Sequence, residues 1–398
     1  MHTQDFSSSS APLENMGCLA YTLKKGLHFD IWLYHPLTGY NRPLVSQLAT
    51  ESSVPYWSSK NDQIAFVGHQ NIVYVVEISS GKIRRIDQVS PSTLLSWSPD
   101  DTKLAYTKQD HIIIYDLFQH TSLAYPQQGA TDVQWFPAGN RLLFQGIDEQ
   151  GNSQVYVLNL ETHQKEALTN VTDMPHHHLR LSSDGRFFLF TSPGVSISII
   201  YTQEINTGNR YELEGGPLGK NYSPAWSPHS QSIAYSATDM TEQGVYYSLI
   251  QSDTHLGGEK RNHAIANCFS TQVAWTADGR ITYLAGCSQD SFPSQIWLID
   301  RNKPIPTLLV NQGQVTAHQW SGSTQRNVVT YERYNHPQYK VSFVYPSHWK
   351  QVSPDRFEGK EVYSSKCPLI RSIYRRRLSY RSDSSPTTLR HRSTDHSY

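Results

Sequence analysis

The stretch LSWSPDDTKLAY, residues 95–106, decides the fold of this chain of 398 residues. A tryptophan leads into Ser-Pro-Asp-Asp, and an apolar run that ends in an aromatic residue follows. Proline presets φ and aspartate bonds to nearby backbone groups, so the middle of the phrase predicts a tight turn. Leu104 and Tyr106 stand two residues apart, which places both on one face of a strand.

The phrase recurs at nearly even spacing along the chain. Its tryptophan position is occupied by Trp57, Trp97, Trp135, Leu181, Trp226, Trp275 and Trp320. Successive positions are 40, 38, 46, 45, 49 and 45 residues apart. A second β-rich run completes each unit, at Ile31–Tyr34, Ile72–Ile78, His111–Leu117, Gln154–Leu160, Ile197–Ile205, Val245–Ile250 and Gln295–Ile299. Repeats of this length are typical of propeller blades.

Each unit predicts three strands joined by turns and a looser fourth strand. Such a sheet cannot bury two apolar faces alone, whereas radial stacking buries them against its neighbours and packs each tryptophan between blades. The first unit, from Gly17, lacks a tryptophan phrase, and the last phrase, at Trp320, lacks a third strand. We therefore predict an all-β, seven-bladed β-propeller closed by pairing of N- and C-terminal strands. Eight blades would require one built from Asn327 onward, and six would discard a repeat.

The phrases WSPDDTKLAY, LSSDGRFFLF, WSPHSQSIAY and WTADGRITY resemble the TolB-like β-propeller repeat, a cousin of WD-type repeats, over about residues 17–331. The resemblance implies the architecture and says little about function, because one fold hosts many functions. TolB-like repeats occur in periplasmic assembly proteins, in the propellers of prolyl-oligopeptidase-type peptidases and in oligogalacturonate lyase.

Four segments are expected along the chain. Residues 1–16 are predicted to be disordered and residues 17–331 to form the propeller. Residues 332–359 contain FVYPSHW, which resembles the first strands of a PsbP-like domain. Residues 360–398 carry a net charge of +6, are rich in Ser and Arg and predict a disordered basic tail. We expect that a second domain begins here and is cut off, by truncation or by a change of reading frame.

Cysteine usage and the N-terminus bear on the compartment. Cys18, Cys268, Cys287 and Cys367 are scattered without a C-x-x-C pair, so we expect free thiols rather than a disulfide framework or a zinc site. The first residues contain no apolar core of a signal peptide, and no run is long enough to span a membrane. These observations predict a cytoplasmic protein.

Motifs for catalysis are missing from the sequence. It contains no G-x-S-x-G nucleophile elbow and no G-x-x-x-x-G-K phosphate loop. Residues 1–359 carry a net charge of −6, so nucleic acid is not an expected partner. We expect a monomeric, non-enzymatic scaffold without a cofactor or a membrane contact that binds a protein or peptide partner through the loops around a rigid ring.

The residue four places before each tryptophan position is always polar. The set comprises Ser53, Thr93, Thr131, His177, Tyr222, Thr271 and Thr316. One interpretation is structural, with hydroxyls that satisfy backbone groups at the start of the inner strand. The other is a polar ring around one mouth of the central channel, suited to a peptide, a loop or a sugar. We name these seven residues the polar ring and predict it as the binding site.

Three consecutive histidines, His176, His177 and His178, precede the fifth phrase. Together with His318 they could hold a divalent metal in the channel, as in a carbohydrate-active lyase or a sugar-binding propeller. Consecutive strand residues point to alternating faces, so at most two of the three can share a site, and no carboxylate partner is identifiable. We expect channel-lining histidines without metal and keep the lyase as the alternative function.

Overall fold

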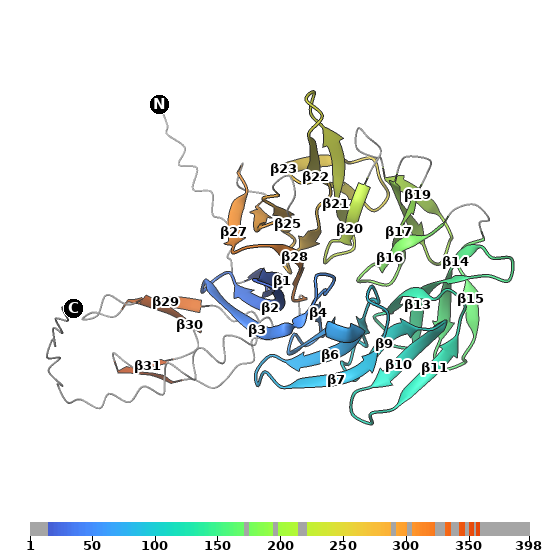
Figure 1. Cartoon of the computed structure of the whole chain (residues 1–398), viewed down its shortest axis with the longest axis horizontal. Helices are drawn as coiled ribbons and strands as arrows, with labels where there is room; N and C mark the ends of the chain where they lie inside the picture. The colour runs from blue at the N-terminus through green and yellow to red at the C-terminus, as the bar shows by residue number, and fades with distance from the viewer. Residues whose placement is uncertain are drawn as a thin grey trace, which may run out of the picture. The chain divides into compact units, whose positions relative to one another are not determined.

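A computed structural model describes residues 15–170, 175–193, 198–213, 221–287, 292–300 and 305–322, and strand segments between 331 and 358. The described strands fall into two compact units, the first ending before residue 329. In the first unit, seven four-stranded antiparallel sheets surround a centre (Figure 1). The all-β, seven-bladed propeller is thereby confirmed.

Each blade has the same order of strands from the centre outward. The inner strands of blades 1 to 7 are β28 (Val315–Trp320), β4 (Tyr56–Trp57), β8 (Ser96–Trp97), β12 (Thr131–Trp135), β16 (His177–Leu181), β20 (Asn221–Trp226) and β24 (Val273–Trp275). The second strands are β1 (Leu19–Lys25), β5 (Gln63–Val67), β9 (Lys103–Lys108), β13 (Arg141–Ile147), β17 (Phe187–Pro193), β21 (Ser232–Met240) and β25 (Ile281–Ala285).

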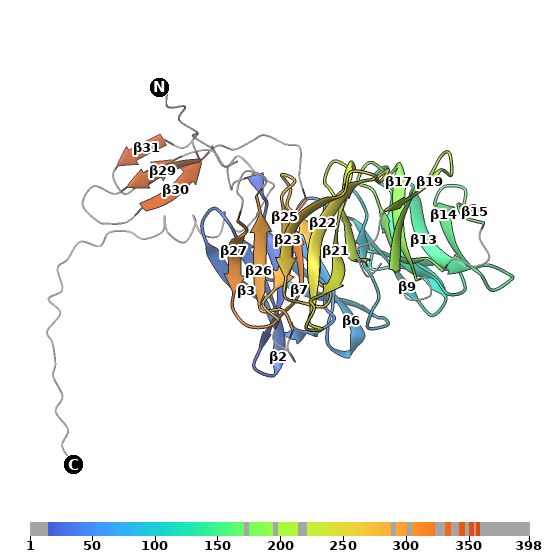
Figure 2. The ribbon, with the colours of Figure 1, turned by 90° about the horizontal axis from the view of Figure 1, so that it is seen from above.

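The third and outer strands complete the blades. The third strands are β2 (His28–His35), β6 (Ile72–Glu77), β10 (His111–Asp116), β14 (Ser153–Asn159), β18 (Ser198–Glu204), β22 (Tyr246–Thr254) and β26 (Gln295–Ile299). The outer strands are β3 (Tyr40–Ala49), β7 (Ile83–Gln88), β11 (Ser122–Pro126), β15 (Lys165–Ala167), β19 (Arg210–Leu213), β23 (Arg261–Ala266) and β27 (Thr307–Asn311). A short 3₁₀ turn, His69–Asn71, joins β5 to β6. Figure 2 shows the blades side-on.

The ring closes as the repeat arithmetic predicts. The last strand of the propeller, β28, pairs antiparallel with β1, so that Leu19 lies opposite Trp320. Beyond the strands, the Cys18 N–H donates to Ser321 Oγ at 2.9 Å and the Ser321 N–H donates to the Cys18 carbonyl at 2.8 Å. One blade is thus assembled from both ends of the propeller, because β28 supplies the inner strand that the N-terminal strands β1 to β3 lack.

Apolar side chains fill the spaces between consecutive blades. A cluster between blades 2 and 3 joins Val75 of β6 to Trp97, Leu104 and Tyr106 of the opening phrase. Both Leu104 and Tyr106 are fully buried, as the two-residue spacing predicts. Equivalent clusters lie between blades 3 and 4, 4 and 5, 5 and 6, 6 and 7, and 7 and 1. The core is therefore a series of layers, each shared by two blades.

The indole groups also make polar contacts across the blades. Trp97 Nε1 donates to the Tyr56 carbonyl at 3.0 Å, and Trp275 Nε1 donates to the Ala225 carbonyl at 2.9 Å. In each case the acceptor is the residue just before the tryptophan position of the preceding blade. The same geometry holds for Trp57 with Gln319 and for Trp226 with Arg180. The recurring tryptophan therefore positions neighbouring inner strands as well as burying apolar surface.

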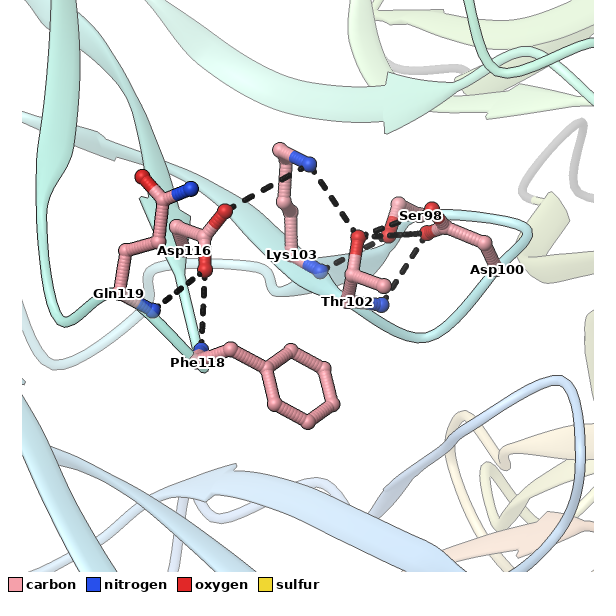
Figure 3. Close-up of polar contacts among 7 residues, drawn as sticks. All are labelled: Ser98, Asp100, Thr102, Lys103, Asp116, Phe118 and Gln119. Atoms are coloured by element: carbon pink, nitrogen blue, oxygen red, sulfur yellow. Dashed lines mark hydrogen bonds and ion pairs between the residues drawn. The ribbon is translucent and has the colours of Figure 1, made fainter.

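The turn after the tryptophan is held by its own side chains (Figure 3). Ser98 Oγ donates to Asp100 Oδ1 at 2.6 Å and accepts the Lys103 N–H at 2.9 Å. Partial burial raises the pKa of the Asp100 carboxyl, but the bonds from Ser98 and Thr102 outweigh it and lower the pKa to about 2. The carboxylate thus stays ionised and fixes the turn that presents β9.

One position of this turn is left-handed in blades 2 to 7. Four residues after the tryptophan position stand Asn61, Asp101, Gly139, Gly185, Ser230 and Gly279, with φ between 57° and 83°. Where that residue has a polar side chain, it reaches the turn of the preceding blade. Asp101 accepts the backbone N–H groups of Ser59 and Lys60 at 2.6 and 2.8 Å. The choice between a short polar residue (Asn, Asp or Ser) and Gly at this position therefore reflects one backbone conformation with two ways of filling the space beside it.

The second unit contains two hairpins in the region predicted to begin another domain. Strand β29 (Tyr331–Asn335) pairs with β30 (Ser342–Pro346), and β31 (Lys350–Ser353) pairs with β32 (Arg356–Glu358). The expected disordered segments, residues 1–16 and 360–398, lie outside the described residues except for residues 15 and 16.

Candidate functional site

The polar ring occupies one end of the inner strands. Thr131 and His177 open β12 and β16, and Tyr222 and Thr316 are the second residues of β20 and β28. Ser53, Thr93 and Thr271 stand just before β4, β8 and β24. The starts of the inner strands of blades 4 and 5 adjoin, since Asp132 of β12 accepts the N–H of Leu179 of β16 at 2.9 Å. The chain thus places the polar ring at one mouth of the propeller.

Two members of the polar ring stabilise their own blades. Ser53 Oγ donates to the Val67 carbonyl and Thr271 Oγ1 to the Leu284 carbonyl, each at 2.5 Å. Both side chains are buried, so their hydroxyls satisfy the ends of the second strands. These contacts match the structural interpretation of the pattern.

Four of the other five members are more exposed to solvent. Thr131 and His177 are exposed, and Tyr222 and Thr316 are half-buried. Thr93 is buried, with a relative exposure of 9%. Whether these residues bind a ligand stays a prediction.

Thr316 differs from the other hydroxyls of the polar ring. Its Oγ1 atom is buried and has no hydrogen-bond partner among the described residues. Thr316 lines a depression of about 380 Å³ together with Gln272, Ser270 and Pro293. An unsatisfied buried hydroxyl costs free energy, so this position gains from a ligand atom that can accept or donate a hydrogen bond.

The histidines do not form a shared site. His318 is fully buried, with Nδ1 3.1 Å from Gln272 Oε1 and Nε2 3.0 Å from Thr282 Oγ1. Burial lowers the pKa of His318 to about 3, so this side chain is neutral and occupied by structural contacts. His176 is also buried, and burial lowers its pKa to about 4. Among the described residues no three His, Cys, Asp or Glu side chains gather as metal ligands.

A larger depression, of about 1120 Å³, lies beside this mouth on blades 6 and 7. We call it the aromatic groove. It shares Ser270, Phe292 and Pro293 with the smaller depression. The full lining comprises Thr241, Gly244, Val245, Tyr246, Tyr247, Ile265, Asn267, Cys268, Phe269, Ser270, Cys287, Phe292 and Pro293. No charged side chain lines it among the described residues.

The long hairpin of β21 and β22 forms one wall of the aromatic groove. Strands β21 and β22 have nine residues each, and their tip, with Val245 and Tyr246, extends from the ring (Figure 1). The Tyr246 ring meets the Phe269 ring edge-on at 5.1 Å between centroids. Tyr222 of the polar ring lies 6.0 Å from the same Phe269 ring. The aromatic groove and the polar ring therefore adjoin at Phe269.

The backbone of the loop that carries Phe269 is held by side chains of β21 and β22. Thr238 Oγ1 donates to the Phe269 carbonyl at 2.5 Å, and Ser248 Oγ donates to the Cys268 carbonyl at 2.9 Å. Its side chain is nevertheless 46% exposed. The backbone is thus held rigid while the ring faces outward.

A disulfide joins Cys268 to Cys287 across this wall. The expectation of four free thiols is therefore wrong for this pair, and it is also wrong for Cys18, which is disulfide-bonded as well, so that none of the described cysteines is a free thiol. The cause is the fold, because the loop after β23 and the loop after β25 come together at the edge shared by blades 6 and 7. Their 19-residue separation carries no local sequence signal. The signal available was the long hairpin Ser232–Thr254 followed by two cysteines, and it indicates the groove only once the blades are placed.

Comparisons with known proteins concern the fold alone. No family model and no curated protein sequence matches this chain. A solved prolyl endopeptidase structure is similar with a TM-score of 0.54 and 11% identity, over 86% of this chain and 54% of that one. TolB from Acinetobacter baumannii is similar with a TM-score of 0.45 and 15% identity, over 77% of this chain and 82% of that one. The Cps50 (Swd1) β-propeller domain of Myceliophteria thermophila gives 0.49 and 11%, over 65% and 86%.

Proposed function

We propose that this chain is a non-enzymatic scaffold that binds a protein or peptide partner at the mouth formed by blades 6, 7 and 1. The observation that carries the proposal is the aromatic groove beside the polar ring. Phe269, Tyr246 and Phe292 are 46%, 47% and 42% exposed, although aromatic side chains of this size are usually buried. Contiguous exposed apolar surface beside a polar rim is typical of a protein interaction site.

Affinity capture with the full chain tests this function. The wild type, a groove variant (Phe269→Ser with Tyr246→Ser) and a polar-ring variant (Thr93→Ala, His177→Ala and Tyr222→Ala) are used as bait in extracts of the native source. Mass spectrometry identifies what each retains. We expect one protein to be held by the wild type and lost from at least one variant. If the same proteins are retained by all three baits, this mouth is not the binding site.

The disulfide bears on the cellular compartment of the scaffold. Within the described residues no helix has the length and apolar character that crossing a bilayer would require. Disulfides persist mainly in oxidising compartments, so the Cys268–Cys287 bond favours such a compartment over the cytoplasm that the sequence predicts. Fractionation of native cells distinguishes the two.

The finer family assignments also stay predictions. The TolB-like character of the repeats rests on the phrases themselves, and the PsbP-like character of residues 332–359 rests on FVYPSHW. The alternative function, a carbohydrate-active lyase or sugar-binding propeller, relies on a histidine-lined metal site, and His318 has both ring nitrogens engaged elsewhere. We therefore favour the scaffold, a monomer that acts through its partner.

A further inference from the structure

We infer that Arg180 forms a binding site for a single carboxylate group, at the mouth of the propeller opposite the polar ring. This site goes beyond the proposed function, which concerns the other mouth. Arg180 stands just before the tryptophan position of blade 5. The corresponding residues of the other blades are all uncharged, namely Gln319, Tyr56, Ser96, Gln134, Ala225 and Ala274.

The position of Arg180 brings its charge to the centre of the ring. It is the last residue but one of the inner strand β16, whereas His177 of the polar ring opens that strand. Burial raises the pKa of Tyr56 to about 12, while the charge of Arg180 lowers this pKa and the charge of Asp132 raises it. Tyr56 belongs to blade 2, which blades 3 and 4 separate from blade 5 on one side and blades 6, 7 and 1 on the other (Figure 1). The charge of Arg180 therefore acts on Tyr56 across the centre.

The guanidinium group of Arg180 is oriented by the backbone of its own strand. Arg180 Nη1 donates to the Leu179 carbonyl at 2.8 Å, and Gln134 Nε2 donates to the same carbonyl. Among the described residues, Nε and Nη2 of Arg180 have no hydrogen-bond partner, and the residue is only half-buried. These two atoms present parallel N–H groups, which match the two oxygens of a carboxylate.

No carboxylate of the described residues forms an ion pair with Arg180. Asp132, whose charge reaches the same centre, uses Oδ2 to accept the Leu179 N–H at 2.9 Å. Another half-buried cation of the blades does have such a partner, since Lys108 Nζ lies 2.7 Å from Asp87 Oδ1. A partly desolvated charge without a counter-ion is stabilised when a ligand supplies one.

The charges around Arg180 favour a ligand with one negative charge. Burial and the charge of Arg180 lower the pKa of His178, so this imidazole adds no second positive charge at neutral pH. A doubly charged phosphate would therefore meet one cation and the repulsion of Asp132. A carboxylate carries one charge, and one guanidinium pairs with it. Asp or Glu side chains of a partner protein and small carboxylic acids share this chemistry.

Protection of Arg180 from phenylglyoxal tests the site on the unmodified full chain. Mass spectrometry maps the modification with acetyl-Gly-Ser-Glu-Ser-Gly-amide or with the same peptide carrying Gln in place of Glu. At about ten times its dissociation constant, the Glu peptide should slow the modification of Arg180 about tenfold. The Gln peptide should not. Arg261, whose side chain is 71% exposed, should react at one rate throughout. Equal rates for Arg180 with both peptides overturn the inference.

Sodium propionate and inorganic phosphate distinguish the sources of the anion. Protection by the Glu peptide at lower concentration than by propionate assigns the site to a partner protein. Equal protection assigns it to a small carboxylic acid, and both results support the inference. Stronger protection by phosphate than by propionate overturns it. If Arg180 without any ligand reacts as slowly as the buried Arg280, a carboxylate of this chain already pairs with Arg180 and the inference is wrong.

Matched variants measure the contribution of the guanidinium by titration calorimetry with the Glu peptide. Arg180→Gln removes the charge and should weaken binding at least about tenfold. Arg180→Lys keeps the charge without the fork and should lie between Arg180→Gln and the wild type. Arg261→Gln serves as the control. Trp226 Nε1 donates to the main-chain carbonyl of Arg180, so both substitutions keep that bond, and melting temperatures verify folding. Equal affinity for wild type and Arg180→Gln overturns the inference.

The groove variant, Phe269→Ser with Tyr246→Ser, separates this site from the proposed function. It should bind the Glu peptide as tightly as the wild type does, because both substitutions lie at the other mouth. If capture shows no partner at the aromatic groove while Arg180 is protected, the proposed function is wrong and the carboxylate site stands. If a partner is captured at the aromatic groove while Arg180 is not protected, this inference alone is wrong.

Discussion

The indole N–H groups show at the residue scale why the tryptophan recurs. Apolar burial alone would accept phenylalanine or leucine, and Leu181 does fill this position in blade 5. Trp320 extends the pattern, since its Nε1 donates to Thr282 Oγ1 at 2.8 Å and Thr282 Oγ1 lies 3.2 Å from the Ala274 carbonyl. Burial between blades was predictable from the phrase. The acceptor was not, because it belongs to the preceding repeat.

Two matched substitutions separate the hydrogen bond of the tryptophan from its packing. Trp275 Nε1 has a carbonyl partner, whereas Trp135 Nε1 is buried without one among the described residues. We expect Trp275→Phe to lower the free energy of unfolding by about 1 kcal/mol more than Trp135→Phe does. Urea unfolding of the two variants measures the difference. Equal losses would show that the bond contributes nothing beyond packing.

His318 makes the stability of the propeller depend on pH. Burial lowers its folded-state pKa to about 3, below the ordinary value of 6.5, so the unfolded chain binds the proton more readily. The contribution is complete above about pH 6.5 and falls by up to about 1.4 kcal/mol for each pH unit from there toward pH 3. His35 and His176, whose pKa burial lowers to about 4, act in the same direction.

Urea unfolding between pH 7 and pH 4 measures this dependence. We expect His318→Gln to have a shallower decline of stability with acid than the wild type. His28→Gln, at an exposed position of β2, serves as the control. Identical pH profiles for wild type and His318→Gln would contradict the assignment.

The turns and hairpins mark the limit of sequence prediction at the element scale. The strands of all seven blades followed from the phrase and its spacing, because period-two burial and turn residues are local signals. The aromatic groove did not, because Phe269 and Phe292 lie in loops with no repeat of their own. They meet only after two blades pack. The polar ring was found as a pattern, but Ser53 and Thr271 turn their hydroxyls to backbone carbonyls.

The disulfide should stabilise this edge of the propeller. Closing a loop of 19 residues restricts the unfolded chain, and loops of that length are stabilised by about 3 kcal/mol. We expect Cys268→Ser, Cys287→Ser and the double variant to lose similar amounts, because each breaks the same bond. Calorimetric melting measures them. A double variant as stable as the wild type would show that the bond does not constrain the fold.

Closure by β28 completes the ring at the scale of the whole molecule. Without it, β1 would expose a row of unpaired backbone groups and the layer between blades 7 and 1 would lose Val315 and Trp320. The number of seven blades was predictable from the sequence, because the first repeat lacks its inner strand and the last tryptophan phrase can supply it. The hairpins β29–β30 and β31–β32 could only be suggested by the pattern of FVYPSHW.

Two shortened chains test the closure. One ends at residue 322 and keeps β28, and the other ends at residue 313 and lacks it, so they differ by the closing strand. We expect the longer chain to unfold in one cooperative transition and remain monomeric. The shorter one should lose cooperativity and associate through its open edge. Circular dichroism and size exclusion measure both properties, and matching behaviour would contradict the role of β28.

The contacts that run from the turn of one blade back to the turn before it have an evolutionary consequence. Asp101 accepts hydrogen bonds from backbone N–H groups of the preceding turn, and Trp97 donates one to a backbone carbonyl of the preceding blade. Neither contact therefore depends on which side chains the preceding blade carries. A duplicated or exchanged repeat could therefore form the same hydrogen bonds to the backbone of the blade before it. The sequence of one blade can therefore change independently of the others. A new loop can arise on one blade while its hydrogen bonds to the neighbouring blades are kept.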